Sequence, residues 1–136
     1  MHQRLIVGFV STALLVATAG ALAYAQESVV RREIINKTEV PSATGATYVA
    51  VQVMAFTAAN GVVARHTHPG VESSYVLEGE ADLLVEGHPP RRVKAGDAFQ
   101  IPAGTPHTLR NGPTPAKVIV TFVIEKDKPI ASPAPE

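Results

Sequence analysis

Two stretches of the chain decide the fold: HTHPGVESSYVLEG at residues 66–79 and GDAFQIPAGTPHTLRN at residues 96–111. Both set short runs of β-branched and aromatic residues between Gly and Pro, a pattern typical of short strands joined by tight turns. Outward from them the same pattern predicts strands at residues 47–56, 62–68, 73–77, 81–85, 91–94, 98–101, 107–110 and 117–124. Asn60-Gly61 predicts a tight turn that joins antiparallel strands. Many short strands without an amphipathic helix predict an all-β fold, an antiparallel sandwich or barrel.

Length and charge restrict the chain to a few classes of protein. Its 136 residues suffice for one domain, and its 12 Lys and Arg residues balance its 12 Asp and Glu residues. Such a chain lacks the positive field that nucleic acid or an anionic membrane surface requires. It contains no Cys, so disulfides, thiolate metal sites and Cys nucleophiles are excluded. Any metal must be held by His and carboxylate side chains.

The N-terminal segment predicts export. His2 and Arg4 precede an uncharged apolar run over residues 5–23, and Ala23-Tyr24-Ala25 supplies a small-x-small cleavage pattern. We expect a signal peptide over residues 1–25, cleaved before Gln26, and a periplasmic or secreted mature protein. The alternative is a retained membrane anchor, because the run approaches the roughly 20 residues that cross a bilayer.

The rest of the chain divides into three parts. Residues 26–46 predict an arm able to pair as an outer strand, residues 47–125 the β-barrel, and residues 126–136 a flexible, charged and Pro-rich tail. An outer strand offers an edge to a second copy, so we expect a homodimer.

Three histidines and one glutamate predict a metal site. His66 and His68 are two residues apart on a predicted strand, so their side chains point to the same side, with Cα atoms roughly 6.5 Å apart. Glu72 follows across a Pro-Gly bend, and His107 follows a loop that two prolines stiffen. Such a donor set suits one divalent transition metal, Fe, Mn, Zn, Ni or Cu. His88 lies in a predicted hairpin turn and receives no role.

These residues resemble the motifs of the cupin superfamily. His66, His68, Glu72 and Gly79 match its first motif, in which Gly61 lies one residue too close to His66; Gly96, Pro102, Gly104, His107 and Asn111 match its second motif at every position. The resemblance covers residues 61–111. It implies a single jelly-roll β-barrel in which His66, His68, Glu72 and His107 hold a divalent metal.

The residues around the metal site and the reaction at the site are also expectations from the sequence. Alternation brings Gln100, Tyr75, Met54 and Phe99 within reach of a substrate pocket, although Phe99 and Gln100 cannot both face inward. Arg65 is a candidate for neutralising a substrate carboxylate. Glu72 is a ligand or, if it swings free, a catalytic general base. We expect a metal-dependent dioxygenase-like oxidoreductase on a small oxygen-rich molecule; the alternatives are a non-catalytic binder and a metal-dependent isomerase, lyase or decarboxylase.

Overall fold

The computed structural model describes residues 30–135, so the predicted signal peptide at residues 1–25 and its cleavage site lie outside the described residues. The described chain forms ten strands: β1 (Val30–Pro41), β2 (Thr47–Thr57), β3 (Val62–Thr67), β4 (Val71–Glu78), β5 (Glu80–Val85), β6 (Arg91–Lys94), β7 (Ala98–Ile101), β8 (His107–Asn111), β9 (Ala116–Glu125) and β10 (Ser132–Pro133). None of its segments is a helix long and apolar enough to span a bilayer.

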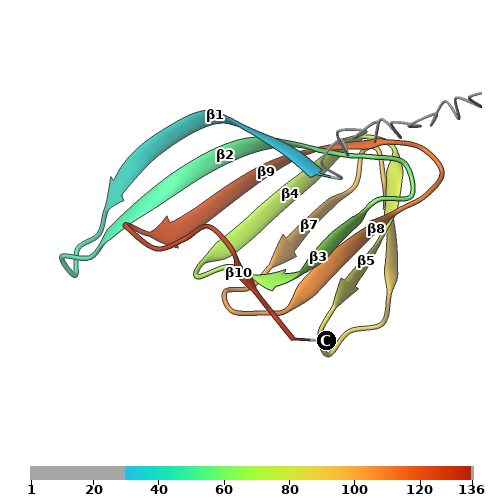
Figure 1. Cartoon of the computed structure of the whole chain (residues 1–136). Coiled ribbons are helices and arrows are strands. Elements are labelled where there is room, and N and C mark those ends of the chain that lie inside the picture. Colours follow the sequence, from blue (N-terminus) through green and yellow to red (C-terminus); the bar gives the residue numbers. More distant parts are fainter. Residues whose placement is uncertain (1–29, 136) are drawn as a thin grey trace, which may run out of the picture.

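The strands form two five-stranded sheets, in the orders β1-β2-β9-β4-β7 and β10-β3-β8-β5-β6. The pairings within both sheets are antiparallel (Figure 1). This arrangement confirms the all-β prediction. The chain moves repeatedly from one sheet to the other, so residues that are distant in sequence meet between the sheets.

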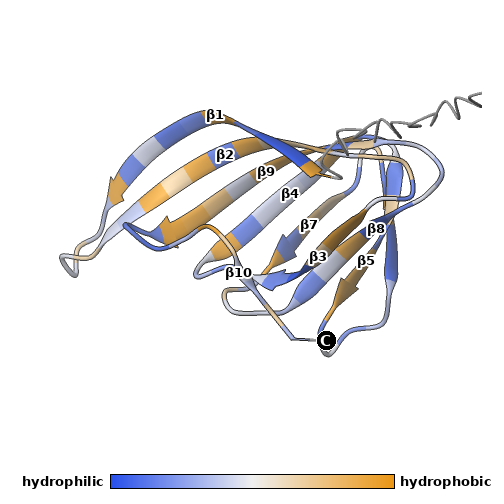
Figure 2. Ribbon diagram, in the orientation of Figure 1, coloured by the Kyte–Doolittle hydropathy of each residue, from blue (hydrophilic) through white to orange (hydrophobic). Residues whose placement is uncertain are grey.

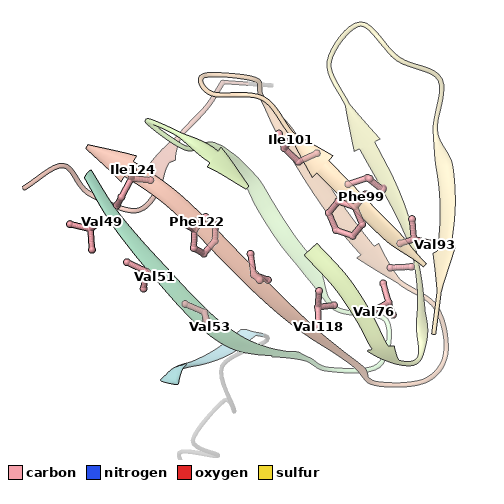
Figure 3. Packing of buried hydrophobic residues seen from close by; sticks show 13 residues of the cluster. Val49, Val51, Val53, Val76, Val93, Phe99, Ile101, Val118, Phe122 and Ile124 are labelled. Carbon is pink, nitrogen blue, oxygen red and sulfur yellow. The ribbon is translucent and has the colours of Figure 1, made fainter. Parts of the chain in front are cut away.

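Period-two alternation places the core between the two sheets. On β2, Val49, Val51 and Val53 are buried, and on β9 the alternate residues from Val118 to Ile124 are buried. Figure 2 shows the apolar residues along both strands, and Figure 3 shows their side chains packed with Phe99, Ile101 and Val93. Burial of these side chains is the main source of stability, since each contributes about 1.5–3 kcal/mol relative to exposure.

The Asn60-Gly61 turn does not join paired strands as expected. It carries the chain from β2 in one sheet to β3 in the other. Asn60 adopts a φ of 55°, a left-handed conformation that Asn tolerates. The buried Asn111 side chain donates hydrogen bonds of 3.0 Å to the carbonyls of Thr57 and Ala58 and so ties this turn to β8.

Both ends of the described chain pair as strands, although a strand was predicted only for the N-terminal arm. The predicted arm forms β1, which pairs with β2 along its whole length as an outer strand. The tail expected to be flexible is instead attached to the barrel: β10 pairs with β3, and the amide of Ala134 donates to the carbonyl of Arg65 at 3.1 Å. Composition suggested disorder, but the tail satisfies its backbone on an exposed sheet edge.

Candidate metal centre

Three strands and two turns bring the four predicted ligands together. His66 lies in β3, His68 directly after it, Glu72 in β4 and His107 at the start of β8. Pro69-Gly70 carries the chain from one sheet to the other between His68 and Glu72. Gly70 has no room for a side chain, because a Cβ there would lie 1.9 Å from the carbonyl oxygen of Val123.

The loop before His107 is joined to the turn after β3. Gly104 has a φ of 70°, which favours glycine, and its amide donates to the carbonyl of His68 at 2.8 Å. This hydrogen bond holds the two motifs at a fixed separation. It explains in backbone terms why a glycine precedes His107 by three residues.

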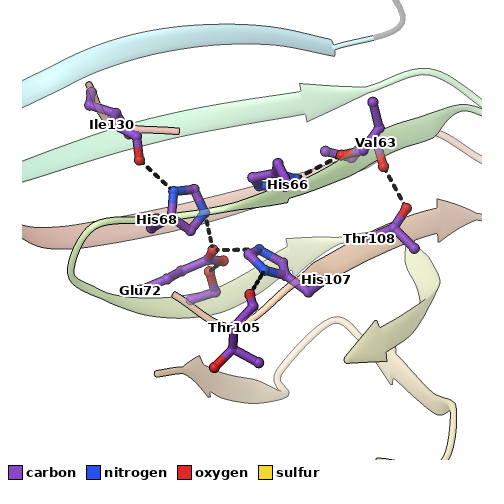
Figure 4. Close-up of polar contacts among 10 residues, drawn as sticks. Val63, His66, His68, Glu72, Thr105, His107, Thr108 and Ile130 are labelled. Carbon is purple, nitrogen blue, oxygen red and sulfur yellow. Dashed lines mark hydrogen bonds and ion pairs between the residues drawn. The ribbon is translucent and has the colours of Figure 1, made fainter. Parts of the chain in front are cut away.

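The four side chains converge on one point between the sheets (Figure 4). Their ligating atoms all lie within 4.8 Å of one another. Glu72 Oε2 is 2.9 Å from His68 Nε2 and 3.2 Å from His107 Nε2, and the three imidazole centroids are 4.3–5.1 Å apart. Glu72, His68 and His107 are buried, whereas His66 is half-buried on the side that faces the opening.

Backbone carbonyls orient all three imidazoles. The Nδ1 atoms of His66, His68 and His107 lie 2.7, 2.6 and 2.9 Å from the carbonyl oxygens of Ala64, Ile130 and Thr105 respectively. A carbonyl only accepts hydrogen bonds, so each Nδ1 carries the proton and each Nε2 presents its lone pair to the centre. Partners of this kind are typical of metal-binding histidines.

The centre fits a cation because its inward-facing atoms are electron-rich and incompletely bonded. His68 Nε2 is fully buried and has no hydrogen-bond partner of acceptable geometry, although it lies within ion-pair distance of Glu72 Oε2. A lone pair that faces a carboxylate at this distance needs a proton or a cation between the two atoms. Three imidazoles and a carboxylate supply the nitrogen and oxygen donors that first-row divalent metals prefer.

Both shifted pKa values in the centre favour the metal-binding protonation states. Burial lowers the pKa of His66 to about 4, and the hydrogen bond to the Ala64 carbonyl offsets this effect only in part. For Glu72, burial raises the pKa, but the close contacts with the His107 and His68 imidazoles and the hydrogen bond from Ser74 outweigh it and leave the pKa well below its ordinary value. At neutral pH His66 is therefore neutral and Glu72 is ionised.

A small cavity of about 70 Å³ extends from the four ligands into the barrel. Of the residues predicted to line a substrate pocket, Phe99 lines this cavity, whereas Gln100, Tyr75 and Met54 do not. Gln100 is exposed, Tyr75 is 46% exposed, and Met54 alternates with the buried Val53 and lies on the other face of the sheet. These three predictions are corrected by strand parity, which the sequence alone did not determine.

Three further polar residues of the cavity were missed by sequence reasoning: Thr57, Ser74 and Arg32. Ser74 follows from alternation, since it lies two residues after Glu72 on β4 and donates to Glu72 Oε1 at 2.6 Å. No sequence pattern indicates that Arg32 lines the cavity, because its position depends on how β1 pairs with β2. Arg65, the predicted partner of a substrate carboxylate, is instead paired with Glu86.

The fold and this centre agree with comparisons with known proteins. The family described as Cupin domain matches residues 53–122, which include all four ligands. The chain belongs to the cupin family. The match spans β2 to β9 and leaves the outer strand β1 and the tail of this cupin outside it.

Three comparisons with two relatives illustrate the range of similarity. The cupin is 46% identical over 57 residues to the dimethylsulfoniopropionate lyase DddQ of Ruegeria pomeroyi, a match that covers 42% of this chain and 28% of that protein. The crystal structure of the same lyase superposes with a TM-score of 0.58 at 26% identity and covers 73% of this chain and 51% of that chain. KdgF from Halomonas sp. gives a TM-score of 0.58 at 25% identity over 75% of this chain and 84% of that chain. The cupin thus spans less than a third of the length of the curated lyase in the sequence match.

Proposed function

We propose that this cupin is a metal-dependent lyase that acts on a small organic molecule. The four converging side chains support it, because their Nε2 and carboxylate atoms face the cavity and one buried nitrogen has no hydrogen-bond partner. The likeness to a lyase at 46% identity over 57 residues supports the reaction class. It favours the lyase alternative over the dioxygenase-like activity that the sequence analysis placed first.

His66, His68, Glu72 and His107 would hold the metal. Four protein ligands leave one position open on a five-coordinate ion and two on a six-coordinate ion, as in reactive rather than closed structural sites. A divalent metal bound there supplies Lewis-acid chemistry toward a substrate oxygen. The carbonyls of Ala64, Ile130 and Thr105 keep the three imidazoles in the ligating tautomer.

Apolar residues of the cavity exclude water, and Glu72, one of the four ligands, accepts a proton. Val118, Val120 and Phe122 form an apolar wall beside the ligands. Glu72 is the one carboxylate that lines the cavity within residues 30–135, and it is the proposed proton acceptor. Its low pKa makes it a weak base while it contacts His68 and His107, so this role would require the carboxylate to move away from them and to give up its place as a metal ligand.

The reaction is an elimination. The proton on the carbon next to the substrate carbonyl or carboxyl passes to Glu72, the C–H electron pair forms a carbon–carbon double bond, and the leaving group departs with its bonding pair. For dimethylsulfoniopropionate, the substrate in the relative's name, the products would be dimethyl sulfide and acrylate.

The test is turnover by the metal-reconstituted protein. Protein loaded separately with Zn, Mn, Fe, Co or Ni is incubated with dimethylsulfoniopropionate, and dimethyl sulfide is measured by gas chromatography and acrylate by NMR. We expect product that disappears on chelation and in His107→Ala but persists in His88→Ala, since His88 is exposed in the β5–β6 turn. Oxygen uptake without elimination would instead establish the dioxygenase reading, and binding without any product would establish a non-catalytic binder.

Export is part of the proposal. The apolar run at residues 5–23 and the Ala23-Tyr24-Ala25 pattern support a cleaved signal peptide. N-terminal sequencing of protein purified from its own host should begin at Gln26. An intact apolar segment on membrane-bound protein would support the anchor instead.

A further inference from the structure

The inner face of β1 contributes to the cavity that holds the metal centre. In the β1–β2 register, Val30 lies opposite Thr57 and Arg32 opposite Ala55. Directly opposed residues share a face of the sheet, and Thr57 and Ala55 both line the cavity. Val30 and Arg32 line it as well, although β1 is an outer strand that lies outside the family match.

The neighbouring arginine lies on the other face. Arg31 is opposite Phe56, and its guanidinium carbon is 3.9 Å from the centroid of that ring. Arg31 also forms an ion pair with Glu33. Two adjacent arginines therefore have different environments, and only one of them reaches the cavity.

A groove of about 640 Å³ continues the cavity toward solvent between β1, β3 and β10. Arg32, His66 and Phe122 line both the groove and the cavity. His66 is the half-buried ligand, so this groove leads to the accessible side of the metal centre. A substrate that enters here passes Arg32 before it reaches the ligands.

Among the described residues, Arg32 is the charged side chain of the cavity and groove that remains free to bind a substrate. The charged residues that line the cavity and the groove, apart from the histidines, are Arg32, Arg65 and Glu72. Arg65 donates to the carbonyl of Pro135 at 2.7 Å and pairs with Glu86, while Glu72 belongs to the metal centre. Within residues 30–135, the Arg32 guanidinium has no ion pair and no hydrogen bond.

We propose that Arg32 binds the carboxylate of the substrate and restricts this cupin to small organic acids. The inference rests on the proposed lyase function and names its substrate class. A guanidinium matches a carboxylate with two parallel hydrogen bonds, and the exposed Arg32 side chain lies beside the apolar residues Val63 and Phe122 that line the same cavity. Among residues 30–135 no carboxylate lines the groove, so its entrance attracts anions.

The experiment measures binding of propionate and of its uncharged isostere propionamide. Titration calorimetry is carried out with the full chain, metal-free and zinc-loaded, for wild type, Arg32→Gln and the matched control Arg31→Gln. We expect Arg32→Gln to weaken propionate binding about 10- to 100-fold in both forms, as befits a lost charged hydrogen bond. Arg31→Gln should change it less than about twofold, and propionamide should bind all three proteins equally weakly. Unchanged zinc content and circular dichroism confirm that Arg32→Gln still folds.

Kinetics separate failure of this inference from failure of the proposed function. If wild type eliminates dimethylsulfoniopropionate, Arg32→Gln should raise KM far more than it lowers kcat. Turnover with an unchanged KM and unchanged propionate affinity in Arg32→Gln would overturn the inference and leave the lyase proposal standing. Arg32-dependent propionate binding without turnover on any metal would overturn the lyase proposal and retain the anion site.

Discussion

His107 reaches the centre from a loop that contains Pro102 and Pro106, and its contribution to metal binding is directly testable. His107→Ala removes one of four ligands and leaves Glu72 Oε2 without a neighbour that now lies at 3.2 Å. Loss of an outer partner of a ligand costs about 10- to 100-fold in metal affinity, so loss of a ligand should cost more than about 100-fold. Competition with a chromogenic chelator measures this, with the exposed His88→Ala as control. Equal zinc affinity in the two variants would contradict the site.

The lowered pKa of His66 predicts a pH-dependent stability of the metal-free protein. Its pKa is about 4 in the folded state, while the unfolded chain has the ordinary value of about 6.5. Between these values the unfolded state binds more protons, so the free energy of unfolding falls as pH falls from about 6.5 toward 4. Glu72 shifts in the same direction but acts at lower pH, since its ordinary value is 4.5.

Urea unfolding at pH 7 and pH 5 isolates the His66 contribution. His66→Gln should lose less stability than wild type between these two pH values, because it has no imidazole to protonate on unfolding. His88→Gln should behave as wild type. The same pH dependence in wild type and His66→Gln would show that His66 is not held neutral by burial.

At the scale of residues, the sequence predicted the four side chains that converge on the candidate metal centre but not the groups that support them. His66, His68, Glu72 and His107 were predicted because spacing along strands and turns constrains side-chain direction. The carbonyl of Ile130 and the guanidinium of Arg32 were not, because each approaches through the pairing of an outer strand. Composition carries no information about such a register.

At the scale of elements, the C-terminal segment contributes to the candidate metal centre. The carbonyl of Ile130 accepts from His68 Nδ1 at 2.6 Å, and Ile130 also packs against the core. A chain that ends at Lys128 lacks this carbonyl, whereas a chain that ends at Ala131 keeps it and lacks β10. We expect about 10- to 100-fold weaker zinc binding for the shorter chain and a smaller loss for the longer one.

Chelator competition and ¹⁵N NMR of the imidazoles check this prediction. The shorter chain should lose the Nδ1-protonated signal of His68, while the signals of His66 and His107 persist. Equal zinc affinities of the two truncated chains would show that the Ile130 carbonyl has no role in orienting His68.

The strands inside the barrel were predicted closely, and the exceptions have a common cause. The predicted strand at residues 91–94 coincides with β6 and that at 98–101 with β7, because Gly and Pro mark their ends. The sequence predicts a flexible tail where β10 forms, because Ser132-Pro133 has no strand pattern and pairs only at an edge. Local sequence predicts strands whose side chains alternate between core and solvent. It does not predict a strand that forms only because it pairs with a strand distant in sequence.

At the scale of the whole molecule, the outer strand predicts association of two copies. β1 pairs with β2 on one edge, and its other edge pairs with no strand among residues 30–135. Ile34 is 61% exposed and Ile35 48% exposed on this strand, at the point where its register with β2 shifts. An unpaired strand edge of this kind is a template for pairing with a second strand. A homodimer with two β1 strands side by side would cover it.

A dimer through β1 would also restrict the movement of the groove that leads to the candidate metal centre, since Arg32 lies on the same strand as Ile34. Analytical ultracentrifugation at micromolar concentration should give twice the mass of the mature chain. Ile34→Glu combined with Ile35→Glu should give a monomer, because each charge would be desolvated at the interface. Val123→Glu, at a residue 41% exposed on β9, is the matched control and should remain a dimer. A single-chain mass for wild type would refute the dimer, and a dimer that survives both Glu substitutions would place the interface on another surface.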